Sequence, residues 1–269
     1  MFSYRHAFHA GNHADVLKHL TLVSVLGHLT QKEVPLLAVD THAGAGFYDL
    51  SQRQAQTSAE SQSGITRLFE KWAELGELSP ALADYLNVVK ALNPSGSARH
   101  YPGSPWLLQH LLRPQDRMRW FEMHPTDWRA LSQLIKTWEL GARVRLDHAD
   151  GFEGVMPLVP PPSRRGLVIM DPSYEIKTDY ARVVQSMEAC LKRFATGVYL
   201  VWYPIIARPQ SQQLPKQLMK LAQAAGKPWL NATLRVQSGG KGTPQRPGLV
   251  NPRSLGPLSA SGMFVINPP

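Results

Sequence analysis

The segment GLVIMDPSYEI, residues 166–176, carries four consecutive apolar residues directly up to a carboxylate and an aromatic ring. Because proline cannot donate to a sheet ladder, we expect a strand that ends before Pro172 and leaves Asp171 and Tyr174 beyond its end. In open α/β sheets, ligands bind at the carboxyl ends of the strands. An ordinary Asp-Pro turn gives the same pattern. The choice between a turn and a site therefore depends on the rest of the chain.

A glycine-bearing loop follows another expected strand, at residues 34–39. The loop has the sequence DTHAGAG, and its Gly44 and Gly46 would let a ligand approach the backbone closely. No lysine of the Walker type follows, which weighs against a nucleoside triphosphatase. By itself, the loop predicts only that something is bound there.

Acidic residues stand where two further strands are expected to end. RMRWFEM ends near Glu122, which is placed to accept from ribose hydroxyls, and ARVRLDHADG ends near Asp150, which is placed to accept from an adenine amino group. Glu60 also has a suitable spacing from the glycines, but no strand surrounds it. Together with Asp171, the two strand-end acids would face one crevice. This order favours an S-adenosylmethionine-dependent methyltransferase over a dehydrogenase, although such acids also cap helices.

Strands alternate with helical patterns along most of the chain. We expect further strands in GVYLVWYP, WLNATLRVQ and GMFVINPP, and helices at 104–112, 125–139, 178–194 and 208–225. Such alternation is typical of βαβ units with right-handed crossovers and a mostly parallel sheet. The pattern predicts an α/β fold.

Two intervals break this alternation. Residues 49–100 contain the helical patterns ITRLFEKWAEL and PALADYLNVVKAL, and we predict a small helical insertion within one domain that spans residues 1–269. Residues 238–262 are rich in glycine and proline, which predicts a mobile loop. The basic side chains of this loop, which we expect to contact RNA phosphates, are Lys241, Arg246 and Arg253.

The composition indicates a polyanionic partner. The net charge is +9 and the pI is near 9.8, yet only 18% of residues are charged, so the bias belongs to a folded surface and not to a disordered tail. The single cysteine, Cys190, excludes a disulfide framework and a cysteine zinc site. No apolar run approaches the length of a membrane span, and the first residues lack a signal-peptide pattern. We expect a cytoplasmic protein with no membrane partner.

The tetrapeptide DPSY, residues 171–174, resembles the D/N-P-P-Y/F signature of methyltransferases that act on exocyclic or amide nitrogens. The lone pair of an adenine N6 is delocalised into the ring, so the amine is a poor nucleophile. Asp171 and the carbonyl of Pro172 would accept its two N–H bonds, and Tyr174 would stack on a flipped base. Ser173 replaces the usual second proline, which would leave the loop looser.

Further motifs resemble one family over nearly the whole chain. SYRHAFHAGNHADVLKHL, DTHAGAG, YPGSP, EMHP, ADGF and RRGLVIMDPSYE are similar to the bacterial 23S ribosomal RNA adenine-N6-methyltransferases, the RlmJ-like group. The resemblance implies a Rossmann-like methyltransferase fold with a small helical insertion, S-adenosyl-L-methionine as cofactor and 23S ribosomal RNA as substrate. It implies Asp171 as a catalytic residue and Tyr4 as a substrate contact. The expected cofactor contacts are Lys18, His19, His42, Gly44, Ser104, Glu122, Asp150, Gly151 and Asp171.

The first nineteen residues contain four histidines. His9 and His13 have the i, i+4 spacing of metal ligands, but no cysteine and only Asp15 stand near them, so we expect no metal. A helix is expected to begin after Asn12 as N-cap. Lys18 lies away from the apolar face of that helix, and the family resemblance makes it a cofactor or phosphate contact.

Two other functions fit parts of the same pattern. Methylation of DNA adenine or of protein glutamine uses the same nitrogen chemistry. A different class is a non-catalytic RNA-binding protein on a methyltransferase fold, at which Ser173 hints. The intact acids and the HAGAG loop argue against such a degenerate site.

Overall fold

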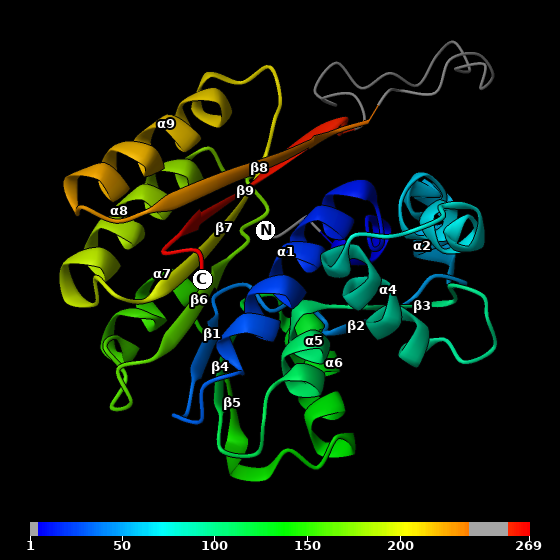
Figure 1. Ribbon diagram of the computed structural model, residues 1–269, viewed down its shortest axis with the longest axis horizontal. Helices are drawn as coiled ribbons and strands as arrows, with labels where there is room; N and C mark the ends of the chain where they lie inside the picture. Colours follow the sequence, from blue (N-terminus) through cyan, green and yellow to red (C-terminus); the bar gives the residue numbers. More distant parts are fainter. Residues whose placement is uncertain (1–4, 237–257) are drawn as a thin grey trace.

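In the computed structural model, the described residues are 5–236 and 258–269. Tyr4 and the basic residues of the predicted 238–262 loop (Lys241, Arg246 and Arg253) lie outside them. Seven strands form the central sheet in the order β5-β4-β1-β6-β7-β9-β8 (Figure 1). Their bounds are β1 Leu37–Asp40, β4 Arg117–Phe121, β5 Val144–Asp147, β6 Gly166–Met170, β7 Val198–Pro204, β8 Trp229–Arg235 and β9 Ala260–Ile266.

The strand order reverses between β1 and β6, at the middle of the sheet. Strands β5, β4, β1, β6 and β7 are parallel, and β9 runs antiparallel to both of its neighbours. From β1 the chain first adds β4 and β5 on one side and then β6 and β7 on the other. Such a reversal of direction is where ligands bind in open α/β sheets. The predicted Rossmann-like α/β fold is confirmed.

Helices cover both faces of the sheet, as Figure 1 shows. Two separate clusters of buried apolar side chains lie between the layers. One cluster lies under α1 His13–Leu29, α5 Ser104–Leu111 and α6 Pro125–Thr137, and the other under α7 Gly151–Gly154, α8 Thr178–Arg193 and α9 Pro209–Ala224. Strands buried on both faces read as continuous apolar runs, which explains the residues GLVIM of β6.

Two predicted strand boundaries are wrong. The first strand begins at Leu37 and ends at Asp40, because Val34 is 49% exposed and Pro35 cannot donate to the ladder. The strand expected to end near Asp150 ends at Asp147. Asp150 is instead the N-cap of α7, where its side chain accepts from the backbone N–H of Phe152.

The segment predicted as an insertion is helical. It contains α2 Arg53–Ser58, α3 Ile65–Glu70 and α4 Pro80–Leu92. The short antiparallel strands β2 Phe47–Asp49 and β3 His100–Pro102 pair where the segment leaves and rejoins the rest of the chain. The division of the chain into one domain with this insertion stays a prediction.

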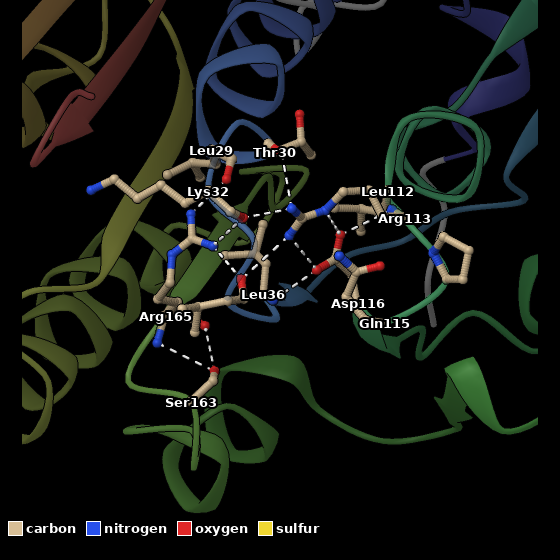
Figure 2. A network of polar contacts seen from close by, with 12 residues as sticks. Leu29, Thr30, Lys32, Leu36, Leu112, Arg113, Gln115, Asp116, Ser163 and Arg165 are labelled. Atoms are coloured by element: carbon tan, nitrogen blue, oxygen red, sulfur yellow. Dashed lines mark hydrogen bonds and ion pairs between the residues drawn. The ribbon is translucent and has the colours of Figure 1, made fainter.

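Two arginines hold the connection between α1 and β1 (Figure 2). Arg113 donates to the carbonyls of Thr30 and Lys32 at 2.9 and 2.5 Å, and Arg165 donates to that of Leu29 at 2.5 Å. Both also reach the carbonyl of Val34. These contacts satisfy the carbonyl of the last helical residue, Leu29, and carbonyls of the connection that follows it.

A buried acid completes this cluster. Asp116 is fully buried, and its carboxylate accepts from the Arg113 guanidinium at 3.0 and 3.1 Å and from the Leu36 N–H at 2.8 Å. Arg113 and Asp116 precede β4, and Arg165 precedes β6, so the cluster lies at the amino ends of the parallel strands. It fixes the end of α1 against the sheet and thereby sets where the start of that helix lies.

We expect Arg113→Ala to lower the free energy of unfolding by ~3–5 kcal/mol, because it leaves the buried carboxylate of Asp116 without its cation. Urea denaturation measures the loss. Arg117→Ala is the matched control, since Arg117 is exposed and, among the described residues, its guanidinium bonds only turn carbonyls, at 3.2 Å. Equal losses in the two variants would contradict the role given to the Arg113–Asp116 pair.

Candidate active site

Four carboxylates gather at the carboxyl ends of the parallel strands. Asp40 ends β1, Glu122 follows β4, Asp150 caps α7 after β5, and Asp171 follows β6. The electrostatic influence of Asp40 reaches Glu122, and that of Asp171 reaches Asp40. The structure therefore brings together the three acids that the sequence predicted, and adds Asp40.

Asp171 is held by a lysine from the opposite end of the sequence. The ammonium of Lys18 lies 2.5 Å from Oδ2 of Asp171 and 2.9 Å from Oδ1 of Asp15. Its side chain is 8% exposed, and that of Asp171 is 18% exposed. Within the described residues, no hydrogen bond reaches Oδ1 of Asp171. One carboxylate oxygen is thus fixed, and the other is left for a ligand.

The charges of this group stabilise one another. Burial disfavours the ammonium, but Asp15 and Asp171 raise the pKa of Lys18 above its ordinary value. Burial likewise disfavours the Asp15 carboxylate, but His6 and Lys18 hold its pKa well below the ordinary value. Lys18 and Asp15 are therefore charged at neutral pH. The prediction of Lys18 as a cofactor contact stays untested, and its observed partners are the two acids.

The start of α1 is tied to the helical segment. Asn12 caps α1 by accepting from the N–H of Asp15 at 3.0 Å, and it donates to Oε2 of Glu60 at 2.9 Å. Oε1 of Glu60 lies 2.9 Å from the ring of His9, whose pKa it raises through this hydrogen bond. Asn12 is the N-cap that the sequence predicted. Glu60 thus holds the turn before the helix that carries Lys18.

Glu122 joins the glycine loop to the turn after β4. Its Oε2 accepts from the N–H of Gly44 at 2.7 Å, and its Oε1 accepts from the N–H of His124 at 2.6 Å. Gly44 has φ +64°, and a Cβ there would lie 2.7 Å from the Tyr48 hydroxyl. Burial raises the pKa of Glu122 to about 7 despite the two N–H donors, and Asp127 adds to this effect.

Sequence reasoning missed Asp40. This residue is fully buried, one oxygen accepts from the His42 N–H at 3.1 Å, and Oδ2 has no hydrogen bond of good geometry among the described residues. Burial raises the pKa of Asp40 to about 6, although the nearby Ser104 hydroxyl favours the ionised form. The signal was present in the sequence, because Asp40 opens the DTHAGAG loop.

Asp150 and Gly151 lie at the start of α7, after the carboxyl end of β5. Oδ2 of Asp150 lies 2.6 Å from the Arg182 guanidinium, which lies over the Phe152 ring at 4.6 Å. A Cβ on Gly151 would lie 2.0 Å from the carbonyl of Thr41. Glycine is therefore required for α7 to approach the loop after β1.

The histidines predicted as cofactor contacts occupy different positions. His42 lies in the loop after β1, its ring meets Phe152 edge-on, and burial lowers its pKa to about 4. His19 is 1% exposed and bonds the Tyr101 hydroxyl at 2.8 Å, and burial lowers its pKa to about 3. Both rings are neutral at physiological pH. His19 belongs to the packing between α1 and β3.

Tyr174 lies inside the structure. It is 2% exposed, its hydroxyl donates to the Trp202 carbonyl at 2.7 Å, and its ring lies 4.5 Å from that of Tyr180. Its φ is +55°, and its carbonyl accepts from Arg208 at 2.9 Å. Stacking on a flipped base stays a prediction that requires the ring to leave this packing. Pro172 is buried and Ser173 is exposed.

The crevice has the groups that S-adenosylmethionine requires. The incompletely bonded carboxylate of Asp40 suits a cationic amino group, and Glu122 suits ribose hydroxyls. The glycine at position 44 keeps the loop backbone open to a ligand. Among the residues that the structure describes, no group of three or more His, Cys, Asp and Glu side chains is arranged to hold a metal ion.

Comparison with known proteins identifies the family. Residues 33–269 match the sequence model of the family described as ribosomal RNA large subunit methyltransferase D, RlmJ. The chain belongs to the RlmJ family. It is 41% identical over 269 residues to ribosomal RNA large subunit methyltransferase J of Escherichia coli, with 100% of this chain and 88% of that protein covered.

Other relatives agree with this assignment to the RlmJ family. Ribosomal RNA large subunit methyltransferase J of Haemophilus influenzae is 39% identical, with coverage of 100% of this chain and 88% of that protein. The crystal structure of protein LPL1258 from Legionella pneumophila superposes with a TM-score of 0.80 at 32% identity, covering 97% of this chain and 87% of that one. The chain is an S-adenosylmethionine-dependent methyltransferase, as its motifs predicted.

We expect Lys18→Met to lower the free energy of unfolding by ~3–5 kcal/mol, because the buried Asp15 loses the ammonium that compensates it. Urea denaturation followed by circular dichroism measures the change. Lys32→Met is the control, since Lys32 is exposed in the loop after the same helix and forms no ion pair in the described part of the chain. A loss within ~0.5 kcal/mol, the range of ordinary surface changes, would contradict the ion-pair role of Lys18.

Proposed function

We propose that the chain methylates the N6 nitrogen of an adenine in 23S ribosomal RNA, with the target base flipped into the DPSY site. The observation that carries the proposal is the carboxylate of Asp171 at the carboxyl end of β6, fixed through Oδ2 by Lys18, with no hydrogen bond to Oδ1 from the described residues. The names of the Escherichia coli and Haemophilus influenzae relatives support ribosomal RNA as the substrate class. The net charge of +9 suits a polyanionic substrate.

Asp171 and Pro172 prepare the nucleophile. Oδ1 of Asp171 accepts one N–H bond of the target amine, and the carbonyl of Pro172 accepts the other. Both bonds favour the pyramidal nitrogen that attacks. Lys18 holds Oδ2 of Asp171 and limits the rotation of the carboxylate, so that the reacting atoms are aligned, which is the main requirement of a direct transfer. The methylated nitrogen carries a positive charge and therefore releases its proton readily to solvent.

The cofactor is held by the other acids. Asp40 binds its amino group, Glu122 its ribose, and Asp150 with Gly151 the adenine side of the crevice. When bound, S-adenosylmethionine supplies an electrophilic methyl group on a sulfonium centre. The cofactor contacts predicted at Lys18, His42 and Ser104 belong to this same proposal.

The proposal places the chain in the cytoplasm with its ribosomal RNA substrate. Among the described helices, none is long and apolar enough to cross a membrane. Transfer of a radiolabelled methyl group to pools of RNA, DNA and protein tests the substrate class. Label in DNA or in protein glutamine, or no label in any pool, would support the alternatives of a DNA or glutamine enzyme or of a non-catalytic RNA-binding protein.

We expect Asp171→Ala to reduce methyl transfer by more than ~100-fold, because the target amine loses the group that positions it. Cofactor affinity should change little, since other acids bind the cofactor. Asp147→Ala is the control, because Asp147 also ends a strand but bonds Arg119 and Arg145. Methylation by Asp171→Ala near the wild-type rate would contradict the role of Asp171 in positioning the target amine.

We expect S-adenosylmethionine binding to release protons between pH 6 and 7. The pKa of Glu122 is raised to about 7, and ribose hydroxyls that donate to it favour its ionised form, so binding lowers that pKa and affinity rises with pH. Calorimetry in two buffers of different ionisation enthalpy measures the release. Glu122→Gln should weaken binding by ~1.5–3 kcal/mol and release fewer protons. If Glu122→Gln leaves both the affinity and the proton release unchanged, Glu122 does not bind the ribose.

A further inference from the structure

A hollow lies between the start of α8 and the first three turns of α9. Its volume is about 320 Å³, at the lower end of the ~300–1,000 Å³ typical of ligand pockets. Its lining comes from the start of α8 and from one side of α9: Lys177, Thr178, Tyr180, Ala181, Gln210, Gln213 and Gln217. None of the acids of the crevice belongs to this lining, so the hollow is a second feature.

The chain segment that carries Asp171 leads directly to the hollow. Residues 171–177 run from the end of β6 directly into it, and a chain of seven residues spans at most ~25 Å. Helix α9 follows β7, and its first turn is tied to that strand because Ser211 donates to the Pro204 carbonyl at 2.6 Å. Both walls of the hollow therefore start at the edge of the sheet where the chemistry takes place.

The side chains of the hollow suit a nucleobase. Glutamine amides both donate and accept, so they can bond the edges of an unpaired base, whereas a phosphate would need donors alone. Ile176, which precedes Lys177 in the chain, is 54% exposed. An apolar side chain at this place gives the face of a base something to pack on.

The charges around the hollow suit nucleic acid. Helix α9 contains no aspartate or glutamate but carries Lys216 and Lys220. Lys177 lines the hollow, and Arg208 precedes α9. The acids at the start of α8 are Glu175, which is exposed, and Asp179, which is buried. A protein partner would not require a helix without acids, whereas an RNA strand is repelled by acids and attracted by lysines.

We propose that this hollow binds a nucleotide of the RNA strand next to the target adenine, with Gln213 and Gln217 bonding the base and Lys177 its phosphate. The inference rests on the proposed function, because it takes RNA as the substrate. It adds a base-reading contact outside the crevice. The glutamines restrict which sequences next to the adenine are accepted, and the crevice itself reads only the target base.

The test compares Gln213→Ala/Gln217→Ala with a matched control, Gln212→Ala/Gln223→Ala. The control residues lie on the same helix, are exposed and do not line the hollow. Methylation of a ribosomal RNA hairpin should show KM raised about tenfold at unchanged kcat in the first variant, the size of one or two lost hydrogen bonds, and no change in the control. An unchanged KM in the first variant would overturn the proposal.

Hairpins with a single abasic nucleotide at each of three positions on either side of the adenine locate the contact. One such RNA should raise KM for the wild type about tenfold and have no further effect on Gln213→Ala/Gln217→Ala, because the same contact is already missing. Equal losses in both proteins at every position would overturn the proposal. Lys177→Ala should reduce the slope of log affinity against log salt by ~0.7, and the glutamine variant should leave it unchanged.

Failure of the proposed function gives a different result. If the wild type labels no RNA, the function fails, and fluorescence anisotropy with the same hairpins still tests the hollow. The glutamine variant should then bind about tenfold more weakly than the wild type and the control. Equal binding by all three proteins would show that the glutamines do not contact the RNA and would overturn the inference.

Discussion

The ion pair between Lys18 and Asp171 is the contact on which the site depends. It joins two residues 153 positions apart and brings helix α1 to the end of β6. Two buried charges are stable only when each is compensated, and here Asp15 and His6 complete the compensation. The same contact orients the Asp171 carboxylate. Stability and chemistry therefore rest on one group of charges.

The amino ends and the carboxyl ends of the parallel strands have different roles. At the amino ends, Arg113, Asp116 and Arg165 bond the connection after α1 and fix that helix against the sheet. At the carboxyl ends, Asp40 and Asp171 each have one oxygen without a hydrogen-bond partner among the described residues. A helix of seventeen residues spans ~25 Å, so a fixed end determines where Lys18 lies. The structural cluster at one edge thus positions the reactive group at the other.

The helical segment and the hollow between α8 and α9 lie on opposite sides of Asp171 along the chain. Glu60 holds the turn before α1, so the segment supports the residue that holds Asp171. On the other side of Asp171, the chain continues into the hollow between α8 and α9. The residues around Asp171 are thus supported from one side, and on the other side the chain leads to the hollow that we propose to bind RNA.

The sequence alone determined the alternation of strands and helices, the family and the acids Glu122, Asp150 and Asp171, because apolar periodicity and short motifs are local properties. It also placed the N-cap at Asn12. It could not determine that Lys18 bonds Asp171, that Glu122 bonds Gly44, or that Tyr174 is buried. Each of these is a contact between distant segments, and the end of β5 was misjudged because capping by Asp150 depends on the helix that follows. Only the packing of α1 and the loops on the sheet decides such contacts.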